Sequence, residues 1–152
     1  MQHSVKYDET RQSRLTSGLH TGKPADSRHL QAFRYNQAMH DIPNRIADVL
    51  LEIESILRAY GRWDNNQPAM NKLNSTEPFC LDTLRFEQWL QWIFLPRMKQ
   101  ILEHGKPLPR KSGIHVYAQE YLQKKDPPTS RLLLHIKRFD DLISIQSGVR
   151  RH

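Results

Sequence analysis

Cysteine is almost missing from this chain, which has only Cys80 among its 152 residues. A single cysteine cannot form a disulfide within the chain, and it cannot supply the paired thiolates of a structural zinc site. There is also no run of about 20 apolar residues, the length that a membrane-spanning helix needs. Residues 1–10 have no apolar stretch after a basic start, so we expect no secretory signal there. These absences favour a cytoplasmic protein without a membrane anchor.

Motifs that hold nucleotides and metal ions are missing too. The six glycines are dispersed, and neither GxxxxGK nor GxGxxG occurs, which argues against a standard nucleotide-binding loop. The eight histidines form no HxH or HExxH arrangement, so we expect no metal site and no cofactor. No pattern in the chain is typical of a catalytic site, and we expect no enzymatic activity.

The chain carries a formal net charge of +7, from 23 Lys and Arg against 16 Asp and Glu. A positive surface suits a polyanionic partner such as RNA, although a moderately basic protein need not have one. The charge is spread along the chain, whereas a dedicated nucleic-acid domain usually shows a sharper stripe. Direct RNA binding through the basic surface and the N-terminal tail therefore stays open as an alternative.

The chain is expected to divide into a tail at residues 1–38 and a domain at residues 39–152. Ser, Thr, Gln, Arg and His dominate the tail, which buries too little apolar surface to offset the entropy cost of ordering. We therefore predict a disordered or loosely packed tail, in which Ser27 is a candidate cap for a short helix. Met39 is a candidate internal start, because an uninterrupted helical pattern begins just after it.

Apolar residues at helical spacing predict four helices. They are expected over residues 42–60, 84–104 and 114–124, and from Thr129 or Ser130 onward. In the first helix, Asp41 is expected to cap the start and Gly61 to stop the end. Pro127 and Pro128 are interpreted as a break before the fourth helix. Four helices with short connectors predict an all-α, compact four-helix bundle.

The second helix is apolar over a wide arc, which is typical of a central helix in a bundle. Trp89 is therefore expected at the packed centre. Pro96 removes the backbone hydrogen bond to the carbonyl of Trp92, so a kink is expected at this proline.

Candidate binding residues gather around the second helix and the segment before it. Tryptophans can stack on bases while arginines contact phosphates, with core packing as the alternative explanation. The residues that fit this role are Trp63, Trp89, Trp92, Arg62 and Arg97. A polar cluster beside aromatic walls would form a partner-binding groove or a structural lock. The predicted groove comprises Trp63, Phe79, Asp82, Trp92, Arg97, Tyr117 and Glu120.

Two pairings would give chemistry instead of binding. Asp82 with Glu77 or Glu120 would form the carboxylate site of a small enzyme, although Asp82 also suits a helix cap. Cys80 with His104 or His115 would form a nucleophile and its base, although a lone cysteine between apolar neighbours is more often buried packing. The Asp82/Glu120 site is kept as an alternative function.

Several short blocks resemble the YqcC-like family, a bacterial domain of unknown function. The blocks are Ser75–Phe79, Asp82–Thr83, Gln88–Trp92, Pro96–Met98, Pro107–Pro109 and Tyr117–Glu120. The run Gln-Trp-Leu-Gln-Trp followed by Pro-Arg is specific, and the resemblance covers about residues 42–145. Residues 1–38 depart from it, since family members usually begin near the equivalent of Met39.

The resemblance implies a small, cytoplasmic helical bundle found mainly in gammaproteobacteria. Genes of this family commonly lie beside that of tRNA pseudouridine synthase C, which implies an accessory role in tRNA modification, and the family supplies no catalytic residues. We therefore predict a non-enzymatic helical binding module whose partner is a tRNA pseudouridine synthase or its tRNA.

Overall fold

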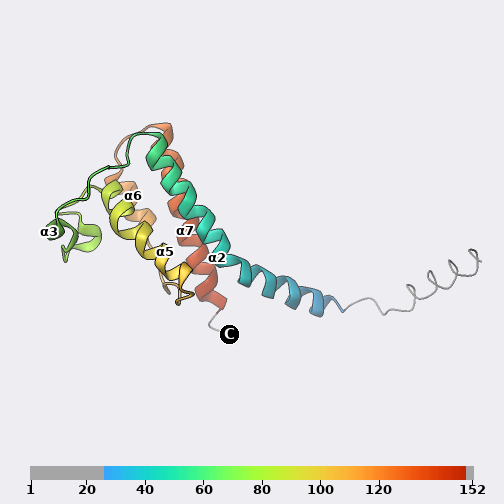
Figure 1. Cartoon of the computed structure of the whole chain (residues 1–152). Coiled ribbons are helices and arrows are strands. Elements are labelled where there is room, and N and C mark those ends of the chain that lie inside the picture. The colour runs from blue at the N-terminus through green and yellow to red at the C-terminus, as the bar shows by residue number, and fades with distance from the viewer. Residues whose placement is uncertain (1–25, 150–152) are drawn as a thin grey trace, which may run out of the picture. The chain divides into compact units, whose positions relative to one another are not determined.

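The structure is a computed structural model that describes residues 26–149. It divides between Ala38 and Met39 into two units. The described residues form helices and no strand, so the predicted all-α fold is confirmed (Figure 1). The elements are α2 (Ser27–Ala59), α3 (Met70–Leu73), the 3-10 turn η1 (Pro78–Cys80), α4 (Phe86–Trp89), the π turn η2 (Leu90–Phe94), α5 (Leu95–Glu103), α6 (Ile114–Tyr121) and α7 (Pro127–Val149).

Four helical segments form the bundle, and each corresponds to one of the predicted helices. They are α2, the continuous segment α4–η2–α5, α6 and α7 (Figure 1). Their apolar faces form one core. The largest fully buried side chains are Ile42, Ile46, Leu50, Ile53, Leu57, Leu90, Leu95, Leu132, Ile136, Phe139 and Ile143. Burying one such side chain is worth about 1.5–3 kcal/mol, so the residues whose spacing predicts the helices also supply the main stabilisation.

The helix α2 begins at Ser27, well before the expected start. It runs through Asp41 and Pro43 without a break, so the prediction that Asp41 caps the first helix is wrong. Extending a helix costs little once a packed turn exists, and residues 27–42 contain neither glycine nor proline. The helix therefore continues backward from its packed part.

The part of the predicted tail that the structure describes is this helical extension. All side chains of residues 26–38 are exposed. Asp26 precedes the helix, and its carboxylate accepts a hydrogen bond from the backbone N–H of Arg28 at 3.4 Å. The rest of the predicted tail, residues 1–25, lies outside the described residues.

The other end of α2 is closed at Gly61, as predicted. Gly61 has a φ of 65°, in the left-handed region that favours glycine. The N–H of Arg62 donates to the carbonyl of Leu57 at 2.8 Å, and the N–H of Gly61 donates to the carbonyl of Arg58 at 3.4 Å. These paired bonds form a Schellman motif, which fixes the position of Arg62 just beyond the helix.

The second helical segment is irregular in its middle. In η2 the N–H of Leu95 donates to the carbonyl of Leu90, five residues earlier, and Pro96 follows directly. The irregularity thus precedes the proline at which the kink was expected. Leu90, the first residue of the π turn, is fully buried. Trp89, which precedes the turn, is only half-buried at the edge of the core. The prediction of Trp89 at the packed centre is wrong.

The fourth helix begins at Pro127, before the predicted start at Thr129 or Ser130. Proline suits the first turn of a helix because that turn leaves its N–H groups without helical partners. The carboxylate of Asp126 accepts a hydrogen bond from the N–H of Thr129 at 2.8 Å, as an N-cap residue does. Pro127 and Pro128 therefore start α7 instead of breaking the chain before it.

The helix α6 receives its N-terminal cap from α7. Gly113 precedes α6 and has no side chain that could cap it. The carboxylate of Asp140 in α7 accepts hydrogen bonds from the N–H groups of His115 at 2.9 Å and Ile114 at 3.3 Å, and from the hydroxyl of Ser112. A carboxylate at a helix N-terminus is favourable, so α7 fixes the orientation of α6.

Candidate functional site

A buried glutamine ties the connector after α2 to the second helical segment. The side chain of Gln91 is almost fully buried. Its amide oxygen accepts a hydrogen bond from the N–H of Asp64 at 2.8 Å, and its amide nitrogen donates to the carbonyl of Asp64 at 2.7 Å. Buried polar groups need such partners. The second glutamine of the Gln-Trp-Leu-Gln-Trp run therefore has a structural role.

The carboxylate of Asp64 is held by the start of α4. The amide of Gln88 donates to it at 2.9 Å, and the guanidinium of Arg85 donates to both of its oxygens at 3.2 Å. The side-chain oxygen of Gln88 accepts a hydrogen bond from the N–H of Arg85. Asp82 lies before this cap and accepts a hydrogen bond from the hydroxyl of Ser75 instead. The interpretation of Asp82 as the helix cap is wrong.

Arg62 connects the end of α2 with the start of α7. Its guanidinium donates to both carboxylate oxygens of Asp126, at 2.8 and 3.0 Å, and to the hydroxyl of Thr129 at 2.8 Å. Hydrogen bonds from Thr129, and to a smaller extent from Arg62, lower the pKa of Asp126. The side chain of Arg62 is only 12% exposed. It forms a structural lock, so the prediction that Arg62 contacts phosphates is wrong.

Phe79 lies at the centre of an aromatic cluster. Its ring centroid is 4.7 Å from that of Trp89, 6.0 Å from that of Phe86 and 4.5 Å from that of Tyr117. Phe79 and the adjacent Cys80 have φ values of 57° and 50°. For residues other than glycine, this conformation costs of order 1–3 kcal/mol. The strained turn directs Phe79 toward Tyr117, so two residues of the predicted groove are in contact.

The side of α6 that faces away from the core exposes mainly apolar side chains. Val116 is 67% exposed, Tyr121 is 45% exposed and Tyr117 is 39% exposed. Glu120 lies on the same side and is exposed as well. We call these four side chains the α6 face. The opposite side of the helix is buried and comprises Ile114, Ala118 and Leu122.

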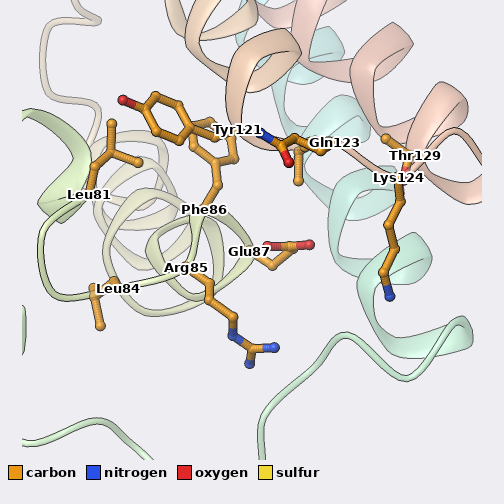
Figure 2. A pocket seen from close by; sticks show the side chains of 10 residues that line it. Leu81, Leu84, Arg85, Phe86, Glu87, Tyr121, Gln123, Lys124 and Thr129 are labelled. Atoms are coloured by element: carbon orange, nitrogen blue, oxygen red, sulfur yellow. The ribbon is translucent and has the colours of Figure 1, made fainter.

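An open pocket of about 270 Å³ borders the α6 face, between the start of α4 and the end of α6 (Figure 2). Tyr121 belongs to both the pocket and the α6 face. Leu81 and Leu84 contribute apolar surface to the pocket. Its charged residues are Arg85, Glu87 and Lys124 (Figure 2). The pocket thus extends the α6 face with a mixed apolar and charged surface.

Three residues of the predicted groove have other environments. Trp63 is half-buried, and the guanidinium of Arg58 lies 4.0 Å from its ring centroid. Trp92 is half-buried, and its indole Nε1 is buried without a hydrogen-bond partner among residues 26–149. Arg97 is exposed on α5 and takes part in none of the ion pairs of those residues.

No hydrogen bond or ion pair joins the residues proposed for catalysis in the described part of the chain. Asp82 and Glu120 are both exposed, and no hydrogen bond between them is formed there. Cys80 is buried, and this burial raises the pKa of its thiol, with the charge of Asp82 as a smaller cause. A raised pKa lowers the fraction of reactive thiolate at neutral pH.

The acidic, histidine and cysteine side chains of residues 26–149 are dispersed. No group of three or more His, Cys, Asp or Glu side chains is placed there to hold a metal ion. None of the described helices combines the length and the apolar character needed to cross a bilayer.

Val116 and Tyr121 are the site residues that the predicted groove omits. Both lie within the predicted third helix, residues 114–124, which carries apolar residues on two sides. A helix of a small bundle can bury only one of these sides. The second apolar stripe was therefore the signal of an exposed face, although spacing alone does not tell which stripe is buried.

The chain resembles known proteins over the helical bundle. Residues 45–142 match a family model described as DUF446, tRNA pseudouridine synthase C. A relative named uncharacterized protein YqcC, from Escherichia coli strain K12, is 32% identical over 101 residues, which are 66% of this chain and 93% of that protein. The chain belongs to the YqcC-like family. The resemblance stated from the sequence blocks is therefore confirmed.

Two further matches extend this family assignment. The solution NMR structure of YqcC from E. coli is similar with a TM-score of 0.60 and 31% identity, covering 68% of this chain and 88% of that chain. A protein named tRNA pseudouridine synthase C, from Pectobacterium carotovorum subsp. carotovorum, is 46% identical over 67 residues. The matched residues are 44% of this chain and 18% of that protein. The YqcC-like chain thus shares a segment with a protein that carries the name of a synthase.

Proposed function

We propose that this YqcC-like chain is a non-enzymatic helical binding module that assists a tRNA pseudouridine synthase. The observation that carries the proposal is the 67-residue similarity to a segment of a protein named tRNA pseudouridine synthase C. Covalent linkage holds a segment beside the rest of its chain at a high effective concentration. We infer that a separate chain with a similar segment reaches the synthase by non-covalent association.

The α6 face is the surface that fits such a partner. Its exposed apolar residues include Tyr117 and Tyr121, and tyrosine is enriched in protein–protein interfaces. The face is preorganised, because Asp140 caps α6 and Phe79 packs against Tyr117. A partner helix could lay its apolar side along this face, with the neighbouring pocket supplying charged groups at the rim.

Co-purification with tagged tRNA pseudouridine synthase C from the same cells tests the partnership. The change Val116→Asp places a charge on an exposed side chain of the α6 face, and it should reduce recovery at least about tenfold because an unpaired charge in an apolar interface is costly. The matched control Leu134→Asp alters a side chain of similar exposure, 60%, on α7. It should leave recovery unchanged.

The outcomes separate the surface from the partnership. Equal recovery of the wild type and Val116→Asp would contradict the α6 face as the contact surface. No recovery of the wild-type chain would contradict the partnership itself. Both variants should keep the melting temperature of the wild type, because both altered side chains are exposed. The two recoveries can be compared when this condition is met.

Arg97 stays a predicted part of the partner surface. Because it is exposed and takes part in none of the ion pairs of residues 26–149, the change Arg97→Gln removes a surface charge without breaking a described contact. Reduced recovery of the synthase would extend the surface to α5, and unchanged recovery would confine it to the α6 face.

The cellular consequence concerns one tRNA product. Loss of this chain should lower pseudouridine at the position that the synthase modifies, and it should spare the positions of other synthases. RNase treatment during co-purification adds a second criterion, since direct protein contact survives it and an RNA bridge does not. An unchanged pseudouridine level in the deletion strain would contradict the accessory role.

A further inference from the structure

The N-terminal part of α2, residues 27–38, carries a surface that the proposed function does not use. All of its side chains are exposed, including those of Phe33 at 60% and Tyr35 at 49%. It also lies outside residues 45–142, which match the family model. These side chains therefore belong neither to the core nor to the region that defines the family.

The charge of this segment has one sign. Residues 27–38 contain two arginines, one histidine and no acidic residue, and the nearest acidic residues along the chain are Asp26 and Asp41. One side of the helix carries Arg28, Gln31, Arg34 and Tyr35, because the last three residues follow Arg28 by three, six and seven positions. None of the ion pairs formed among residues 26–149 includes either arginine.

We propose that this side of the helix, defined by Arg28, Gln31, Arg34 and Tyr35, binds the phosphate backbone of a folded RNA. Arginine presents several N–H donors in a plane that matches phosphate oxygens. Gln31 can hydrogen-bond to sugar or phosphate groups, and Tyr35 can stack on an unpaired base. The absence of acidic side chains in the segment favours a polyanion over a protein surface of mixed charge. The inference rests on the proposed function only in the choice of tRNA as the RNA.

The test is tRNA binding by the full chain without any synthase. Fluorescence anisotropy of labelled tRNA is measured from about 50 to 200 mM salt, the range over which phosphate contacts weaken steeply. The double change Arg28→Gln/Arg34→Gln should raise the Kd about tenfold at about 0.1 M salt. It should also reduce the slope of log Kd against log salt by about 2, because each phosphate contact contributes about 1.

The charge-matched control is Lys106→Gln/Arg110→Gln. Both residues are exposed in the connector between α5 and α6, so the control removes the same net charge from another surface. It should leave the slope unchanged. Tyr35→Leu should weaken binding several-fold and leave the slope unchanged as well, because stacking releases no counterions.

Each remaining outcome overturns the proposal. An equal Kd and an equal salt slope for the wild type and the double variant would show that Arg28 and Arg34 do not contact the RNA. An equal loss of binding in the control would show a general charge effect. Salt-independent binding that is lost in Phe33→Ala would indicate an apolar contact instead. A wild-type chain that binds no tRNA at about 100 μM, weaker than ordinary non-specific binding, overturns this proposal alone, since synthase recovery is measured separately.

Discussion

The two parts of α2 differ in packing. Residues 42–57 bury seven apolar side chains, whereas residues 27–38 bury none. A short helix is marginal in water on propensity alone, so the exposed part depends on continuity with the packed part. The difference shows that buried side chains, and not backbone regularity, mark the part of the helix that stabilises the fold.

The same contrast occurs around the circumference of α6. One side of this helix supplies core residues, and the other side forms the exposed α6 face. The buried side of each helix thus stabilises the fold, and the exposed side carries the proposed binding surface. This separation makes variants possible that remove a proposed contact and leave the fold intact.

The largest expected effect is on the packed part of α2. Ile53 is fully buried, and its change to Ala should lower the free energy of unfolding by about 2–5 kcal/mol, since a large-to-small core change leaves a cavity. Phe33→Ala, in the exposed part, should change it by less than about 0.5 kcal/mol. Urea denaturation followed by circular dichroism measures both. Similar losses for the two variants would abolish the contrast.

A second prediction concerns the C-terminal end of α2, where Arg62 binds Asp126. The folded-state pKa of Asp126 is lowered, so its carboxylate stabilises the fold above the ordinary value of about 3.9. This contribution is lost as the pH falls through the folded-state pKa. Asp126→Asn should therefore lower the melting temperature at pH 7, and its difference from the wild type should narrow as the pH falls.

The control for this pH dependence is Asp141→Asn. Asp141 is exposed and pairs with Lys137 on the surface of α7, and such pairs contribute little to stability. Its change should alter the melting temperature less than Asp126→Asn does at pH 7. A constant difference between Asp126→Asn and the wild type at all pH values would show that the charge of Asp126 is not the cause.

Local patterns were sufficient to predict the four helices and the stop at Gly61. Apolar spacing reports burial along a helix, and glycine readily adopts the left-handed conformation of a helix end. The bonds from Arg62 to Asp126 and from Gln91 to Asp64 join residues distant in the sequence. Apolar spacing carries no information about such pairs, so neither contact could be predicted from the sequence.

The residues of the predicted groove lie in different environments for the same reason. Phe79 and Tyr117 meet in space, as the groove requires. Trp63 instead stacks with Arg58, which directly precedes the last residue of α2. Proline was also ambiguous, because Pro127 fits the break before a helix as well as its first turn. Tertiary contacts decide between these possibilities.

A smaller effect is expected from matched Ala→Gly changes along α2. Ala47→Gly, within the packed part, should cost about 1 kcal/mol because glycine loses more backbone entropy in a helix. Ala32→Gly, within the exposed part, should reduce helical ellipticity and leave the cooperative unfolding transition in place. Circular dichroism at low temperature and on heating separates the two effects. A shifted transition in Ala32→Gly would show that residues 27–38 unfold together with the bundle.

The smallest effect on stability is expected from a chain that begins at Met39. Removing residues 27–38 takes away no buried side chain, so the melting temperature should stay within a few degrees of the full chain while the helical ellipticity per molecule falls. A fall of about ten degrees or more, equivalent to at least 2 kcal/mol for a domain of this size, would show that the N-terminal residues stabilise the bundle. The same shortened chain should lose its salt-dependent tRNA binding and still recover the synthase through the α6 face. Loss of both tRNA binding and synthase recovery would mean that the N-terminal part of α2 and the α6 face do not act separately.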